Sequence, residues 1–206
     1  MEDQTKEKNK AISFVKSNFK IIISFLVILI LVFSIYSWLK IRTEVKKNNL
    51  SENYIEAKIM ISQKKSDEAL DILKNIINEN DKTYSVLSLY LIIDQKLEKD
   101  ERKIINYFDK VLSIKSLKNE DSDLIKLKKA IFISSYENEK ELLKLLNPII
   151  NSDSVWKIQS IKFLADFYFS KKEFNKADQY YLQLLTFENA NIDINEIKRK
   201  IKTYKK

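Results

Sequence analysis

Residues Ile158–Asn189 read IQSIKFLADFYFSKKEFNKADQYYLQLLTFEN, and this stretch decides the fold that we expect for the chain. Its apolar residues recur at the period of an α-helix in two runs. Ala165 and Ala177 lie twelve positions apart, one in each run. Because both side chains are small, two helices that meet there can bring their backbones close together. The stretch therefore predicts a closely packed pair of helices, over residues 154–170 and 173–188.

The same helical period continues from Leu50 onward, in blocks broken by clusters of Lys, Asp, Asn and Ser. The other expected helices cover residues 50–62, 67–79, 83–97, 101–115, 122–135, 138–147 and 193–204. The candidate N-caps are Asp67, Asp81, Ser122, Ser154 and Asp193. The candidate helix ends are Asn80, Asn119, Asn147 and Asn189, because Asn tolerates the left-handed conformation when Gly is missing.

These helices come in pairs, and the pairs share a pattern. The step of twelve residues also joins Ala57 to Ala69 in the first pair. In the third pair Leu142 follows Ala130 at this step, so the second small residue is lost. The second pair keeps Tyr84, Leu87, Ser88 and Leu91, followed by a longer turn at Glu98–Glu101. The last pair is the most regular and carries Ile161, Leu164, Ala165, Tyr168, Ala177, Tyr181 and Leu184 in register.

Helix pairs at a spacing near 34 residues are typical of the tetratricopeptide repeat (TPR). Such a pair buries its apolar stripe only against its neighbours, and the terminal units need polar caps. Helix 193–204 fits a cap whose Ile194, Ile197 and Ile201 point inward. The sequence thus predicts an all-α chain with about four TPR-like pairs and a C-terminal capping helix, in a solenoid with one concave surface. A helical bundle without repeats remains the alternative.

Composition limits the possible chemistry. The chain has no Gly, His or Cys, and its single Pro is Pro148. Without Gly it lacks the glycine loops that cradle phosphates, and without His and Cys it lacks a zinc cluster, a thiol nucleophile and a His-based triad. Glu120, Asp121 and Asp123 are expected to begin a solvated helix, since the Gly and the final Glu of a calcium loop are missing. We therefore predict no catalytic, cofactor-binding or metal-binding residue and no enzyme activity; an enzyme built on Lys, Tyr and carboxylates is the remaining alternative.

An apolar stretch, Ile21–Leu39, reads IIISFLVILILVFSIYSWL and holds no charge. Nineteen helical residues extend about 28 Å, close to the thickness of the hydrocarbon core of a bilayer. The run is longer than the apolar region of a cleaved signal peptide. We therefore predict a transmembrane helix at 21–39, between a tail at 1–20 and a TPR-like helical domain at 48–206. A buried core helix is the alternative.

Charge gives only part of the topology. Five cations lie within twenty residues of the apolar stretch on each side, so the positive-inside rule does not choose an orientation. We expect a cytoplasmic N-terminus, because the tail is short and the translocation of a long domain depends little on charge.

The charge of the helical domain bears on its partners. Residues 48–196 carry 22 cations and 25 anions. This mildly acidic body argues against a nucleic-acid partner. The basic run Lys198–Lys206 fits a solubilising tail, with anionic lipid or an acidic partner as the alternative.

The aromatic residues of the last pair are expected to be mostly core. Trp156 is expected to pack at the joint between repeats. Phe169 and Tyr180 are the expected exceptions, and we predict them as partner-binding residues.

The combination of one N-terminal span and degenerate TPR pairs resembles the membrane-anchored TPR-like proteins that are ancillary subunits of the Sec translocon, in particular their alphaproteobacterial members. The most telling stretch is Leu142–Leu185, with a helix end at Leu145–Pro148, then Trp156, then the regular repeat. The resemblance implies a single span in the bacterial inner membrane, a periplasmic helical domain, and contacts with translocon subunits and periplasmic chaperones. The missing Gly in the turns and the imperfect middle repeats depart from the pattern.

Two functions remain open at this point. The first is a membrane-tethered protein–protein interaction scaffold without cofactor or small-molecule substrate, probed by affinity capture of partners. The second is a structural envelope-organising or cell-division factor that acts by oligomerisation. Light scattering would distinguish a multimer from a monomeric adaptor.

Overall fold

The computed structural model describes residues 18–135, 139–187 and 193–204, and these residues form helices and turns without a strand. The helices are α2 (Phe19–Ser62), α3 (Ser66–Asn78), α4 (Tyr84–Asp94), α5 (Glu101–Leu112), α6 (Asn119–Ile133), α7 (Glu139–Ile150), α8 (Lys157–Ser170), α9 (Phe174–Leu184) and α10 (Ile194–Tyr204). The prediction of an all-α chain is confirmed. The predictions for residues 1–17 and for Asn189 lie outside the described residues.

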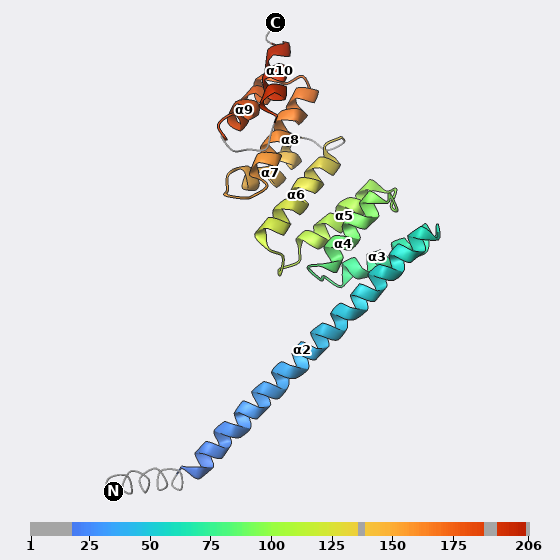
Figure 1. The fold of residues 1–206 in the computed structure, drawn as a ribbon, viewed down its shortest axis with the longest axis vertical. Coiled ribbons are helices and arrows are strands. Elements are labelled where there is room, and N and C mark those ends of the chain that lie inside the picture. Colours follow the sequence, from blue (N-terminus) through green and yellow to red (C-terminus); the bar gives the residue numbers. More distant parts are fainter. Residues whose placement is uncertain (1–17, 136–138, 188–192, 205–206) are drawn as a thin grey trace, which may run out of the picture. The chain divides into compact units, whose positions relative to one another are not determined.

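The chain divides into two compact units, Met1–Asn53 and Tyr54–Lys206. The described part of the first unit consists mainly of the long helix α2 (Figure 1). Its apolar side chains face outward; Phe25 is 67% exposed and Phe33 66%. Within the described residues, α2 is the one helix that is long and apolar enough to cross a membrane, and none of its most apolar window is buried. A core helix, by contrast, would be covered by its neighbours.

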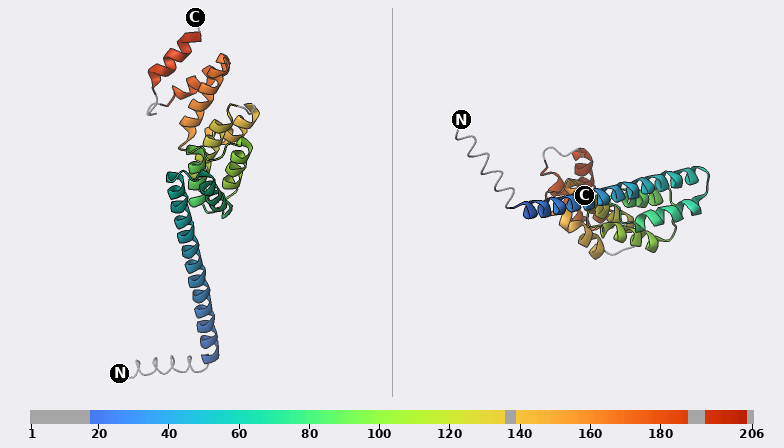
Figure 2. Two further views of the ribbon diagram at one scale, coloured as in Figure 1. Left: turned by 90° about the vertical axis from the view of Figure 1, so that its right-hand side faces the viewer. Right: turned by 90° about the horizontal axis from the view of Figure 1, so that it is seen from below.

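The second unit is a stack in which α3 to α10 follow one another in chain order (Figures 1 and 2). α3 packs against α4, α6 against α7, and α8 against α9. The small residues of the predicted twelve-residue step, and Leu142 at the same step in the third pair, are completely buried: Ala57, Ala69, Ala130, Leu142, Ala165 and Ala177 are all 0% exposed. The close approach predicted for the last pair is confirmed, because α8 and α9 pack against each other with both alanines buried.

The repeat pattern predicts that α4 buries Tyr84, Leu87, Ser88 and Leu91, and the observed buried face is shifted from these positions by one residue. Leu87 is 38% exposed, whereas the buried face consists of Ser85, Ser88, Leu89 and Ile92. The physical reason lies at the start of the helix. The Ser85 hydroxyl donates to the carbonyl oxygen of Ile76 at 2.9 Å and accepts from the backbone N–H of Asp81 at 3.0 Å. This small polar side chain ties α4 to the end of α3 and turns Leu87 outward.

Two predicted helix ends are also wrong. α6 begins at Asn119, so this residue starts a helix and Ser122 lies inside its first turn. α7 continues through Pro148 to Ile150, so Asn147 does not end it. Proline costs one backbone hydrogen bond inside a helix. The buried side chains of Ile149 and Ile150 keep this last turn in the core.

The predicted N-caps are partly confirmed. Asp81 accepts hydrogen bonds from the N–H groups of Thr83 (2.9 Å) and Tyr84 (2.7 Å). Asp193 accepts from those of Asn195 (2.9 Å) and Glu196 (3.0 Å). The prediction for Ser154 is wrong: Trp156 is the N-cap residue of α8, and the Ser154 hydroxyl accepts from the N–H of Trp156 itself, at 3.3 Å. The prediction for Asp67 is wrong, because it lies within α3.

Among the described residues, four adopt the left-handed conformation at turns between helices. Their φ angles are 63° at Lys64, 54° at Asn80, 51° at Lys96 and 61° at Lys172. The left-handed end predicted at Asn80 is confirmed. At each of the three lysines, the next residue donates its N–H to a carbonyl five residues back, as Glu173 does to Tyr168 at 2.9 Å. This is the hydrogen-bond pattern that usually carries Gly at the helix end.

Replacing these lysines with glycine should therefore stabilise the protein. A residue with a Cβ is strained in the left-handed conformation, and glycine relieves the strain but loses more chain entropy on folding. We expect Lys64→Gly, Lys96→Gly and Lys172→Gly each to raise the free energy of unfolding by about 0.5–1 kcal/mol. Urea unfolding of the detergent-solubilised chain would measure this. Lys58→Gly, inside α2, is the control and should lower stability by about 1 kcal/mol; a lower stability in all four variants would contradict the prediction.

Candidate protein-interaction surface

A partly apolar depression lies between α4 and α6, the first helices of the second and third pairs. It has a volume of about 210 Å³. Its lining residues are Tyr90, Ile93, Asp94, Lys128, Ile131 and Phe132. Ile131 is 50% exposed, and the exposed Leu87 lies one turn before Tyr90 on α4. The register that turns Leu87 outward thus adds apolar surface to this side of α4.

Tyr90 gives the depression a polar group. Its hydroxyl oxygen is buried and has no hydrogen-bond partner within the described residues. Burial, with a smaller contribution from the charge of Asp121, raises the pKa of Tyr90 to about 12. The ammonium group of Lys128 lies 4.7 Å from the centre of the Tyr90 ring. A buried hydroxyl without a partner costs free energy, so a bound group that hydrogen-bonds it after a small movement of the covering side chains would gain affinity. Sequence reasoning did not find this site, because it depends on how α4 is rotated.

A second cluster surrounds Tyr168 in the last pair. Its hydroxyl donates to a carboxylate oxygen of Glu139 on α7 at 2.7 Å, and its ring stacks on Tyr180 at 5.6 Å between centroids. The Lys176 ammonium lies 2.9 Å from both oxygens of Glu139. Hydrogen bonds from Lys176 and Tyr168 lower the pKa of Glu139. Burial and the same carboxylate raise the pKa of Tyr168. These contacts join α7, α8 and α9.

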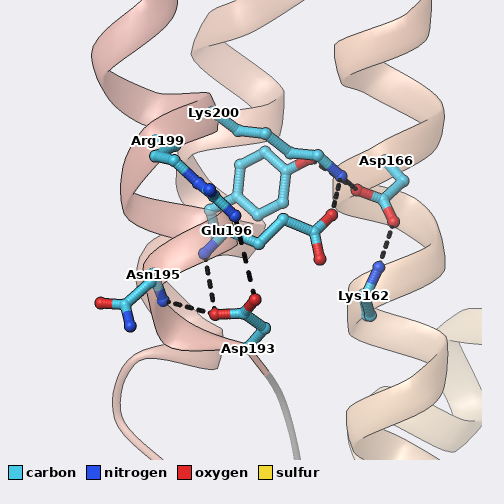
Figure 3. A network of polar contacts seen from close by, with 8 residues as sticks. Lys162, Asp166, Asp193, Asn195, Glu196, Arg199 and Lys200 are labelled. Atoms are coloured by element: carbon cyan, nitrogen blue, oxygen red, sulfur yellow. Dashed lines mark hydrogen bonds and ion pairs between the residues drawn. The ribbon is translucent and has the colours of Figure 1, made fainter.

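A third cluster joins the capping helix α10 to α8 and α9 (Figure 3). Asp166 accepts hydrogen bonds from Lys162 (2.6 Å), Lys200 (2.8 Å) and the hydroxyl of Tyr181 (2.6 Å). Lys200 also pairs with Glu196 at 2.8 Å. Burial alone would raise the pKa of Asp166, but the three hydrogen bonds and the charge of Lys162 outweigh it, and the pKa lies below its ordinary value.

This lowered pKa predicts how stability changes in acid. A carboxylate whose pKa is lower in the folded chain stabilises the fold above its unfolded pKa, near 4, and loses that contribution as the pH falls through the folded pKa. We therefore expect Asp166→Asn to be less stable than the wild type at pH 7 and to lose less stability between pH 4 and pH 2. Urea unfolding at several pH values would measure this, with the exposed Asp153→Asn as control. Parallel pH curves for wild type and Asp166→Asn would contradict it.

The structure places the two predicted partner-binding residues at the edge of the core. Phe169 is partly buried and contacts the rings of Phe174 and Tyr181. The Lys200 ammonium lies 5.9 Å from the centre of its ring. Tyr180 is partly buried against Tyr168. The two residues therefore belong to different clusters.

Trp156 packs at a joint between repeats, as predicted. It is half-buried against the core, and its indole N–H donates to the backbone carbonyl of Glu120 at 2.9 Å. This bond ties the start of α8 to the start of α6.

The acidic residues Glu120, Asp121 and Asp123 lie at the start of α6. Glu120 and Asp121 are in its first turn, and Asp123 pairs with Lys126 at 3.1 Å. The predicted acidic helix start is confirmed. The residues that the structure describes contain no group of three or more acidic side chains placed to hold a metal ion.

The second unit therefore belongs to a class defined by its architecture, an α-solenoid of TPR-like helix pairs. Comparison with solved structures agrees. Two crystal structures of nearly identical TPR-like repeats from Podosopora anserina, provisionally assigned to a kinesin light chain, are similar to this chain, with TM-scores of 0.51 (for a single-residue variant of those repeats) and 0.50. Each is 14% identical in sequence, and each match covers 74% of this chain and 83% of the other. At this identity the similarity shows the fold. No family model and no curated protein matches the sequence.

Proposed function

We propose that this protein is a membrane-tethered scaffold that binds other proteins through the face formed by α4 and α6. A TPR-like solenoid is a fold that presents an extended surface to protein partners. The observation that carries the proposal is the depression at Tyr90. There the half-exposed Ile131 and the partly buried Ile93 and Phe132 lie beside a buried hydroxyl that has no hydrogen-bond partner among the described residues. Interfaces concentrate their binding energy in such pockets.

A photo-crosslinker tests this surface in cells. Placed at Ile131, which lines the depression, it should trap a protein that mass spectrometry identifies. Placed at Val155, an equally apolar position that is 65% exposed and does not line the depression, it should trap none of that protein. Equal trapping at both positions would contradict the assignment of this face.

The tether is the apolar part of α2. We assign residues 1–20 to a cytoplasmic tail, 21–39 to a transmembrane helix and 48–206 to a periplasmic TPR-like domain, in the bacterial inner membrane. The exposure of the apolar side chains of α2 supports this division, since lipid would cover them. We place the N-terminus in the cytoplasm because the domain after the span is long, and the translocation of a long domain depends little on charge.

Because the chain has no cysteine, an introduced cysteine reports topology directly. In inside-out inner-membrane vesicles, an impermeant maleimide should label a cysteine at Asn9 and should reach one at Lys140 only after detergent is added. Labelling of the Lys140 position in sealed vesicles would overturn the orientation.

The sequence resemblance suggests the finer assignment, in which the scaffold is an ancillary component of the Sec translocon that contacts translocon subunits or periplasmic chaperones. Phe169 and Tyr180 would then supply a second contact on the last pair. Tyr180 stacks on Tyr168, whose partner Glu139 lines an open depression of about 480 Å³ on α7. Affinity capture with the full chain should recover translocon subunits, and capture with Tyr180→Ala should lose them. Captured proteins that include no translocon subunit and no chaperone would overturn this assignment.

One observation favours the alternative of an envelope-organising or cell-division factor. Ile55 and Ile59 are 54% and 49% exposed, on the side of α2 opposite the buried Ala57. In a repeat stack a preceding unit would normally cover this face. A stable multimer of the full chain in light scattering, dispersed by Ile55→Glu, would favour the oligomeric function over the monomeric scaffold.

A further inference from the structure

A band of positive charge directly follows the apolar part of α2. Between Leu39 and Ser51 the chain has Lys40, Arg42, Lys46 and Lys47 against a single acid, Glu44. The helix continues unbroken through this segment, so the charges remain at fixed positions after the last apolar turn. All of these side chains are exposed. The band lies wholly within the first compact unit.

Trp38 and Arg42 are placed on one face of this helix. They are four residues apart, and the guanidinium carbon of Arg42 lies 4.5 Å from the centre of the Trp38 ring. Trp38 is 55% exposed, and its amphipathic ring is of the kind that prefers the interface between lipid and water. The stacked ring holds the guanidinium beside the end of the apolar stretch. Lys46 follows four residues later on the same face.

The chemistry of this arrangement fits one ligand, the phosphate group of an anionic phospholipid. A guanidinium is weakly hydrated and presents a planar set of donors that matches phosphate oxygens. The three neighbouring lysines add attraction to a negatively charged surface. A headgroup at this level would have its acyl chains beside the apolar side chains that precede Trp38.

From this geometry we infer that Trp38, Arg42 and the adjoining lysines form a binding site for anionic phospholipid headgroups at the C-terminal border of the span. The inference rests on the proposed span and deepens it, because it names the lipid that surrounds the helix. The site gives the tether a preference for anionic lipid over zwitterionic lipid, and added salt weakens that preference by screening.

Tryptophan quenching tests the inference on the full chain. The protein is reconstituted in phosphatidylcholine vesicles that contain, at equal mole fraction, either phosphatidylglycerol or phosphatidylcholine with the same dibrominated acyl chains. The chain has two tryptophans, and Trp156→Phe leaves Trp38 as the reporter. If this variant unfolds by circular dichroism, the wild type serves, with Trp156 as a constant background.

We expect the brominated phosphatidylglycerol to quench Trp38 more strongly. Arg42→Gln should lower this relative affinity about fivefold, the usual effect of one cation near a charged surface. Lys58→Gln, which removes an exposed charge of α2 outside the band, is the control and should leave it unchanged. Equal quenching by the two lipids, or an unchanged preference in Arg42→Gln, would overturn the headgroup site and leave the span intact. An absence of quenching by both lipids would overturn the span itself, and the site with it.

Discussion

Tyr181→Ala should lower the free energy of unfolding by about 3–5 kcal/mol, because it removes a large aromatic ring from the centre of the last pair. Tyr181 is 1% exposed, and its ring contacts Phe169. Its hydroxyl donates to Asp166, which also holds Lys200 of the capping helix. The substitution therefore leaves a cavity and removes one of the three hydrogen bonds at this carboxylate. Urea unfolding followed by circular dichroism would measure the loss.

Tyr181→Phe separates the two contributions. It keeps the ring and removes the hydroxyl, so we expect a smaller loss of about 1.5–3 kcal/mol, typical of a hydrogen bond to a charged group. Leu182→Ala is the matched control, since its side chain is 53% exposed and the change should stay within about 0.5 kcal/mol. If Tyr181→Ala were no less stable than Leu182→Ala, the packing described for the last pair would be wrong.

Ile131→Glu should weaken binding of the crosslinked partner at least about 30-fold, the effect of losing a central contact in a buried interface. Ile131 is half exposed in the free protein and would become covered in the complex. A glutamate there would place an unpaired charge against the apolar lining of the depression. Because the side chain is exposed in the free protein, folding should be little affected, and the change would appear in binding alone. Affinity measured with the purified full chain would test this.

Val155→Glu makes the same change at an exposed apolar position outside the depression and should leave the affinity unchanged. Tyr90→Phe adds an independent measurement. Without the hydroxyl, the free protein loses an unsatisfied buried group, while the complex loses any hydrogen bond made to the partner. We therefore expect Tyr90→Phe to be at least as stable as the wild type and to bind more weakly. Weaker binding in Val155→Glu than in Ile131→Glu would move the interface away from α4 and α6.

Sequence periodicity located the helices well, because each amphipathic helix carries its own apolar stripe at a fixed spacing. The expected pair at 154–170 and 173–188 corresponds to α8 and α9, and Ala165 and Ala177 are buried as predicted. The pattern failed at α4, where eight of the eleven residues are apolar and the stripe is not distinct. It also failed at Pro148, where a strong local signal for a helix end was overridden by burial of the next two residues.

The candidate site was harder to predict than the fold. Phe169 and Tyr180 were identified from their spacing on single helices, and the part they play in binding remains a prediction. The depression at Tyr90 combines residues of α4 with residues of α6 about forty positions later. No pattern within one helix carries information about such a contact.

The sequence by itself determined that the chain is helical, that one long apolar helix precedes a stack of helix pairs, and that the side chains of His and Cys and the backbone freedom of Gly are missing from it. These properties follow from composition and from the spacing of residues within each helix. The tertiary structure decided the rotation of α4, the burial of the Tyr90 hydroxyl without a partner among the described residues, and the network that joins α10 to Asp166. Each of these depends on contacts between side chains far apart in the sequence, and only packing brings such side chains together.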